Sequence, residues 1–335
     1  MPVKELKSIT IGSLTLNGYV YIPPMAGVTD IVYRKLCREF DPNVLLSTEM
    51  LSSKSLTYAH QNSKTHRHTA RMDIPEGDPL TGIQLFGHEP DVMAEAAKIA
   101  EDSGAKFIDI NMGCPVSKIV KGQDGAALMR EPELACNIVE AVIAATNLPV
   151  TVKTRLGWCS QSMHTAELAK RFEDLGVQAM TIHGRTRAQL YSGEANWEEI
   201  AKIVSSLSIP VFANGDIKNL DDAKEVLRVT GAAGMAIARA TMGKPWLSSQ
   251  INHYISTGEK LPEPNVSERL KLALRHCQML VEYKGLAVGI RESRRHIVNY
   301  SSGMKGAAKI RPQILAINSV AEAEKLIDEL LSLNS

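Results

Sequence analysis

Eight short apolar runs, rich in valine and isoleucine and bounded by glycine or proline, recur between residues 19 and 238. Runs of this length and composition are typical of buried β-strands. They occupy Tyr19–Ile22, Val44–Ser47, Thr81–Leu85, Phe107–Ile110, Val150–Lys153, Ala179–Ile182, Val211–Ala213 and Gly234–Ala238. Helical patterns lie between most of them, with proline near the start or glycine just beyond the end. The clearest are Asp91–Ser103, Glu133–Ala145, Thr165–Leu175 and Asp221–Val229.

Strands that alternate with helices predict a parallel sheet with right-handed crossovers, which places the chain in the α/β class. Eight such units favour a (β/α)8 TIM barrel. The alternative is an open, doubly wound sheet. The count of eight and the lack of a Gly-x-Gly-x-x-Gly turn after the first strand argue against it. Residues 9–18 alternate apolar and polar side chains around Gly12 and Ser13, so we expect a hairpin that covers the bottom of the barrel.

The pattern changes after Trp246. Residues 258–264 contain glycine and two prolines and are typical of a linker. Helical periodicity resumes at Val266–Tyr283, Ala287–Tyr300 and Ala321–Leu331. We therefore predict a barrel domain over residues 1–250 and a helical domain over residues 262–335. Between Lys284 and Arg311 there are seven Lys or Arg residues and one acid, Glu292. This surplus fits either nucleic-acid contact or an ordinary solvated helix face.

Composition narrows the classes of protein to which the chain could belong. The formal net charge is +1, so any nucleic-acid surface must be local. The five cysteines are widely spaced, without Cys-x-x-Cys or metal-ligand spacing, which indicates a reducing compartment and no metal site. We see no signal peptide and no apolar run near the ~20 residues of a membrane span, and we expect a cytoplasmic monomer. Residues 54–71 contain basic residues and three histidines but no acid, and we predict an extended basic loop on the active face.

In a barrel, the carboxyl ends of all strands face one common site. Here they carry Glu49, Gln84, Asn111 with Cys114, Lys153 with Arg155, His183 with Arg185, Asn214 with Asp216, and Arg239. A lone cysteine is most often a small buried hydrophobe, but Cys114 lies in a Gly-Cys-Pro turn at a strand end. Lys153 is placed to hold an anionic ring edge, and Arg239 can pair with phosphate. These groups suggest a phosphorylated cofactor, and FMN fits the size.

The strand-end motifs together resemble those of the tRNA-dihydrouridine synthase family, and most closely its bacterial B-type subgroup. The resemblance runs from about residue 10 to the carboxyl terminus. The motifs are Pro24-Met25-Ala26-Gly27-Val28-Thr29-Asp30, Ser47-Thr48-Glu49-Met50, Gln84-Leu85-Phe86-Gly87, Asn111-Met112-Gly113-Cys114-Pro115, Lys153-Thr154-Arg155-Leu156-Gly157-Trp158, His183-Gly184-Arg185-Thr186 and Asn214-Gly215-Asp216. The resemblance implies an FMN-bearing barrel, a helical domain that helps to grip tRNA, and NADPH as reductant. The implied reaction converts the C5=C6 bond of specific uridines to dihydrouridine.

The resemblance also implies roles for individual residues. Cys114 matches the catalytic acid, which protonates C5 after reduced FMN delivers hydride to C6. The positions that match FMN contacts are Pro24, Met25, Ala26, Gln84, Lys153, His183, Asn214, Gly215, Asp216, Ala238 and Arg239, and Ala238 stands where the family usually has glycine. Asn111 matches a residue that touches the target base. The other expected substrate contacts are Arg155, Arg185, Arg291, Arg294 and Arg295, with Lys305, Lys309 and Arg311 as further candidates.

Two other classes of function remain open from the residues. The first is an FMN-dependent reductase of a small molecule on the same barrel, similar to dihydroorotate or enoate reductases, which would have no use for a basic helical tail. The second is a catalytically idle RNA-binding protein, which the intact Cys114 and the complete strand-end set disfavour.

Overall fold

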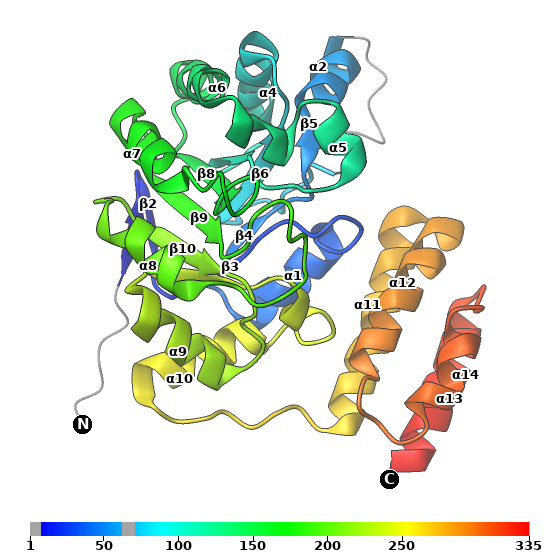
Figure 1. Cartoon of the computed structure of the whole chain (residues 1–335). Helices are drawn as coiled ribbons and strands as arrows, with labels where there is room; N and C mark the ends of the chain where they lie inside the picture. Colours follow the sequence, from blue (N-terminus) through cyan, green and yellow to red (C-terminus); the bar gives the residue numbers. More distant parts are fainter. Residues whose placement is uncertain (1–7, 62–70, 335) are drawn as a thin grey trace.

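The barrel predicted from the eight apolar runs is confirmed in the computed structural model, which describes residues 8–61 and 71–334. In this part of the chain, eight parallel strands close into a ring through pairing of β4 with β6 (Figure 1). They are β3 (Val20–Ile22), β4 (Leu45–Ser47), β6 (Thr81–Phe86), β7 (Ile108–Asn111), β8 (Val150–Arg155), β9 (Ala179–His183), β10 (Val211–Asn214) and β11 (Gly234–Ala236). The short strand β5 (Leu51–Ser52) extends the pairing of β6.

Helices surround the ring of strands. They are α1 (Ile31–Phe40), α2 (Ser53–Gln61), α4 (Pro90–Asp102), α5 (Ser117–Lys121), α6 (Pro132–Ala145), α7 (Thr165–Leu175), α8 (Trp197–Ser205), α9 (Leu220–Thr230) and α10 (Leu247–Thr257), with 3₁₀ turns η1 (Gly125–Arg130) and η2 (Arg239–Thr241). Local sequence sets several boundaries. The Asn219 side chain accepts the first backbone N–H groups of α9, and Gly176 ends α7 in the left-handed conformation.

One prediction near the barrel mouth is wrong. Residues 54–61 belong to helix α2 rather than to an extended loop. Leu56 and Ala59 are buried, and their spacing of three places both on one face of the helix, which packs against α4. Two apolar contacts were therefore enough to favour a helix in a segment without acids. The rest of the predicted loop, residues 62–70, lies outside the described residues.

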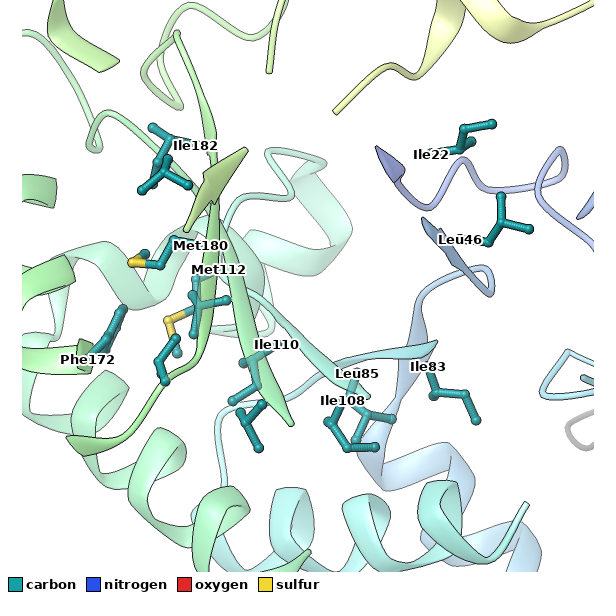
Figure 2. Packing of buried hydrophobic residues seen from close by; sticks show 14 of the residues in the cluster. Ile22, Leu46, Ile83, Leu85, Ile108, Ile110, Met112, Phe172, Met180 and Ile182 are labelled. Carbon is teal, nitrogen blue, oxygen red and sulfur yellow. The ribbon is translucent and has the colours of Figure 1, made fainter. Parts of the chain in front are cut away.

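The largest apolar cluster lies between the strands and the surrounding helices. Figure 2 shows Ile83, Leu85, Ile108 and Ile110 pointing outward from β6 and β7 toward those helices. Because side chains alternate along a strand, the residues between them point into the barrel. Gln84 and Asp109 occupy such inward positions at 1% exposure each. The strands are therefore apolar toward the helices and partly polar toward the axis.

The predicted hairpin is confirmed as β1 (Ile9–Ile11) and β2 (Leu14–Leu16), which pair antiparallel. Its apolar residues pack against Tyr21, Phe107 and Phe212 inside the barrel, where the Tyr21 ring meets the other two edge-on at 6.3 and 6.1 Å. Gly12 at its tip touches Gln178, which immediately precedes β9. The hairpin thus covers the amino-terminal end of the barrel, opposite the strand ends that carry the polar motifs.

The chain beyond residue 258 forms a separate group of helices with its own apolar cluster. They are α11 (Val266–Lys284), α12 (Leu286–Tyr300), α13 (Ala307–Ile314) and α14 (Val320–Asn334). Three were predicted, and α13, which contains Pro312, was not. Asn265 and Glu268 form a reciprocal capping box that fixes the start of α11 after the linker. Helix α10 extends past residue 250, to Thr257.

The helical group lies against α1 of the barrel (Figure 1). Ile31, Val32 and Leu280 form a small apolar cluster between α1 and α11. Lys284 donates to the Asp30 and Glu292 carboxylates at 2.5 and 2.6 Å. Apolar packing and the partly buried Lys284–Asp30 ion pair therefore join the two parts of the chain. None of the helices in the described residues is long and apolar enough to span a bilayer.

Candidate active site at the carboxyl ends of the strands

Cys114 lies in the loop that follows β7, and its side chain is half-buried. The Asn111 Oδ1 accepts the backbone N–H groups of Gly113 and Cys114 at 3.1 and 2.9 Å, which curls the chain immediately after the strand. From the other side, the N–H of Ala126 donates to the Cys114 carbonyl at 3.1 Å. Burial raises the pKa of the Cys114 thiol. The loop therefore presents a protonated thiol at neutral pH.

Behind this loop, side chains from neighbouring strands form a chain of hydrogen bonds. Asn111 Nδ2 donates to Gln84 Oε1 at 2.6 Å, and Gln84 Nε2 donates to Asp109 Oδ2 at 2.5 Å. Thr151 Oγ1 donates to the other Asp109 oxygen at 2.7 Å. Gln84, Asp109 and Thr151 are direct register partners on β6, β7 and β8, so the pairing of the strands brings them together.

Lys153 and Asn214 meet across the barrel mouth. The Lys153 Nζ donates to Asn214 Oδ1 at 3.1 Å, and the Asn214 amide donates to the Ala236 carbonyl at 2.7 Å. Burial, with the Arg155 charge, lowers the pKa of Lys153 to about 8. Burial and the neighbouring cations lower the pKa of His183 to about 2, so its imidazole is neutral. The mouth thus combines a half-buried ammonium, a neutral imidazole and an amide.

Two predicted substrate contacts, Arg155 and Arg185, are each 2% exposed. Arg155 donates to the carbonyl groups of Gly113, Thr186 and Leu190 at 2.8 to 3.0 Å. Arg185 donates to the Ser192 and Gly193 carbonyls and, at 2.7 Å, to the Asp216 carboxylate. Both guanidinium groups hold loops of the mouth in place. Their contact with substrate stays a prediction.

The chain turns tightly beside His183 immediately after β10, and the segment after β11 leads into η2. Gly215 has φ +120°, and a Cβ there would lie 2.7 Å from the Cβ of Ala195. Asp216 also has a positive φ, +57°, and accepts the Ala195 N–H at 2.8 Å. Ala238 precedes η2, where the Arg239 side chain is 62% exposed. The exposed Arg239 guanidinium also lies 3.9 Å from an Asp216 carboxylate oxygen, which keeps the cation beside this turn.

The segment after β3, the strand that pairs with β11, forms the next part of the wall. Pro24 and Met25 are half-buried and Ala26 is exposed. The Gly27 N–H donates to the Glu49 carboxylate. From the helical group, Arg295 reaches this segment, with its Nη1 3.5 Å from the Ala26 carbonyl oxygen. The helical group therefore brings a cation to the edge of the mouth.

The other predicted tRNA contacts differ in exposure. The Arg291 side chain is 66% exposed, and Lys305, Lys309 and Arg311 are also exposed. Arg294 instead donates to the Ile317 carbonyl at 3.0 and 2.6 Å, within the helical group. Lys54 on α2 pairs with Glu89 at 2.9 Å. Among the residues described, no cluster of three or more metal-ligating side chains was found.

Two residues of the mouth were not among the predicted site residues. Asp109 was predicted only to lie in the strand Phe107–Ile110, although a single acid among apolar residues indicates a polar position that faces the inside of the barrel. Tyr191 lies in the loop after β9, where the Arg155 and Arg239 guanidinium groups lie 5.6 and 5.2 Å from its ring centroid. Its ring is also 6.4 Å from that of His183. No periodicity or motif in the sequence distinguishes it.

Comparisons with known proteins agree with this arrangement. Among solved structures, the fold is similar to morphinone reductase in complex with tetrahydroNAD (TM-score 0.54, 12% identity, 79% of this chain and 94% of that one). It is also similar to histamine dehydrogenase from Rhizobium (TM-score 0.55, 12% identity, 94% and 64%). These likenesses show the barrel fold alone.

Relatives in sequence are much closer. A probable tRNA-dihydrouridine synthase 1 from Synechocystis is 45% identical over 99% of this chain and 91% of its own length. The tRNA-dihydrouridine synthase B of Pseudomonas putida is 39% identical over 93% and 91%. The family model described as dihydrouridine synthase matches residues 21–334. The resemblance carried by the strand-end motifs is thereby confirmed, and the chain belongs to the dihydrouridine synthase family.

Proposed function

We propose that this chain is a tRNA-dihydrouridine synthase that reduces the C5=C6 bond of specific tRNA uridines. Membership of the family supports the reaction class and a flavin cofactor. The observation that carries the proposal is the Cys114 thiol, held at the barrel mouth in the loop after β7, where that strand pairs with the strand of Lys153. A proton donor beside a half-buried cation suits a reduction in which hydride addition leaves negative charge on the substrate.

The donors of the mouth fit FMN. An isoalloxazine edge offers carbonyl oxygens and ring nitrogens, for which the Lys153 ammonium and the His183 and Asn214 side chains are suitable partners. An added Cβ at Gly215 would lie 2.7 Å from the Ala195 Cβ and 3.0 Å from the His183 ring, so glycine keeps these side chains at the mouth in place. The exposed Arg239 suits the phosphate group. We infer that Pro24, Met25, Ala26, Gln84, Asp216 and Ala238 complete this site, and that NADPH reduces the flavin.

Held by Lys153, His183 and Asn214, reduced FMN would supply hydride chemistry at C6 of the uracil. Cys114 then donates its proton to C5 from the other face, and its raised pKa keeps that proton in place at neutral pH. The Lys153 cation stabilises negative charge in the mouth. Asn111 shapes the Cys114 loop through its hydrogen bond with the Cys114 N–H, and we propose that it also contacts the base. Arg155 and Arg185 hold the surrounding loops.

A uridine inside folded tRNA must leave its stack to enter the mouth, at a cost of a few kcal/mol. Phosphate contacts from exposed cations can offset that cost. Arg295 at the mouth and Arg291 on the same helix are the best placed. We therefore propose that residues 262–335 form the tRNA-binding domain and residues 1–250 the catalytic barrel. We further propose that the chain acts as a monomer on cytoplasmic tRNA.

The experiment compares Cys114→Ala with Cys159→Ala in the full chain. Cys159 is also half-buried, in the loop after β8, and serves as the matched control. Both variants should purify with bound flavin, but only Cys114→Ala should lose dihydrouridine formation on unmodified tRNA. Near wild-type product from Cys114→Ala would refute its role as the acid. Turnover of free uridine as efficient as that of tRNA would instead favour a small-molecule reductase.

A further inference from the structure

The orientation of two amide side chains in the mouth can be worked out from the groups around them. The N–H groups of Gly113 and Cys114 are donors, so the part of the Asn111 amide that faces them must be the oxygen. The Asn111 nitrogen then faces Gln84, whose nearer atom must be its oxygen. The Gln84 nitrogen is left to face Asp109, and that atom needs an acceptor.

Asp109 is suited to end this chain of hydrogen bonds. Its carboxylate accepts from Gln84 on one oxygen and from Thr151 on the other, and the Tyr21 hydroxyl lies 3.3 Å from the Gln84-facing oxygen. The Tyr21 hydroxyl also lies 2.7 Å from the Ser47 hydroxyl. At 1% exposure, Asp109 has no access to bulk water that could replace these partners. An acceptor at this point is therefore what gives both amides one orientation.

We propose that Asp109 is a positioning residue that fixes the orientation of the Gln84 and Asn111 amides and, through them, the backbone of Cys114. If the acceptor is removed, the Gln84 amide can turn over and present its nitrogen to Asn111. The Asn111 amide must then turn as well, and its nitrogen would face the N–H groups of the Cys114 loop. Two sets of hydrogen-bond donors would then face each other, and the Cys114 loop would lose the bonds that hold it. The consequence for turnover rests on the proposed function, whereas the consequence for the loop does not.

The first test compares the rates at which iodoacetamide alkylates Cys114, read by peptide mass spectrometry. Asp109→Leu removes the acceptor and should raise the rate about fivefold, which corresponds to one net hydrogen bond. Asp109→Asn keeps an oxygen for Gln84 and a nitrogen for the Thr151 hydroxyl, so its rate should stay within about twofold of the wild type. Thr151→Val, the control, removes only a donor to the other oxygen and should also leave the rate unchanged. An unchanged rate in a folded Asp109→Leu variant would overturn the proposal.

The second test does not depend on Asp109→Leu folding. Asn111→Asp places an acceptor opposite Gln84 and forces that amide to turn, so that its oxygen faces the Asp109 carboxylate. This variant should lose several degrees of melting temperature. Adding Asp109→Asn supplies a nitrogen to the turned Gln84 and restores every partner with reversed polarity. The double variant should therefore have a higher melting temperature than Asn111→Asp alone. Additive effects of the two substitutions on the melting temperature would refute the proposed chain of hydrogen bonds.

Turnover separates this proposal from the proposed function. With tRNA, Asp109→Leu should lower kcat by at least about tenfold and leave KM near its wild-type value, because the exposed cations that grip RNA are untouched. Asp109→Asn should retain kcat. A loss of kcat in both variants would mean that the negative charge, and not the acceptor, is required, which overturns the proposal. If the wild-type chain formed no dihydrouridine, the proposed function would fail while the alkylation test still stood.

Discussion

Replacing Gly243 by alanine tests how rigidly the barrel and the helical group are joined. Gly243 lies just after η2 with φ +71°, and a Cβ there would lie 2.5 Å from the carbonyl carbon of Asn299 and 2.7 Å from the nitrogen of Tyr300. Those atoms are backbone at the end of α12, so no side-chain rotation can relieve the contact. The left-handed conformation costs alanine about 1–2 kcal/mol. The enforced overlap adds about 1–3 kcal/mol.

Gly231→Ala is the matched control. Gly231 has φ +65° and ends α9, with nothing within 4 Å of an added Cβ. It should therefore pay only the conformational term of about 1–2 kcal/mol. Scanning calorimetry should show a loss in the free energy of unfolding that is about twice as large for Gly243→Ala as for Gly231→Ala. Gly243→Ala should also weaken tRNA binding, because Arg295 would move away from the mouth. Equal losses in the two variants would refute the idea that the two parts form a rigid contact at this point.

Three further predictions concern charge. The lowered pKa of Lys153 leaves its cation intact below pH about 8 and removes it above, so the single-turnover rate should fall through that pH, and a flat profile to pH 10 would refute the role of the cation. Arg295→Ala should weaken tRNA binding and reduce its salt dependence, whereas Arg294→Ala should mainly lower stability through the lost Ile317 contact; identical effects on affinity would contradict this division. Lys284→Met leaves the buried Asp30 carboxylate without its ion-pair partner across the junction and should destabilise the chain by about 3 kcal/mol in denaturant titration, and a loss below about 0.5 kcal/mol would show that the pair is effectively solvated.

The barrel could be predicted because each buried strand leaves an apolar run that stands out from its neighbours. Helix α7 was predicted at its exact limits because Gly176 marks its end. Helix α2 was predicted wrongly because only two of its positions are strongly apolar and buried. Helix α13 was missed because a proline interrupts its pattern. Short helices that rely on tertiary packing carry little signal of their own.

The site was predictable at residue level only where a strand end and a motif coincide. Cys114, Lys153 and His183 were predicted in this way, and the structure brings the strand ends that precede or carry them to one mouth. The motifs do not show which arginine side chains are exposed and which are bonded within the protein. Arg185 and Arg295 have the same chemistry, yet one is 2% exposed and bonded to its own loop while the other is exposed at the mouth. That difference arises from loop conformation, which has no periodic pattern.

The hairpin at the amino-terminal end has a kinetic consequence. Ile11, Leu16 and the aromatic side chains packed against them fill that end of the barrel. Reactants must therefore reach the candidate active site through the opposite end. A folded RNA seated over that opening would obstruct a dinucleotide donor, so we expect the two reactants to alternate rather than to bind together. Double-reciprocal plots at several fixed concentrations of the second reactant should then be parallel, which is the pattern of a ping-pong mechanism.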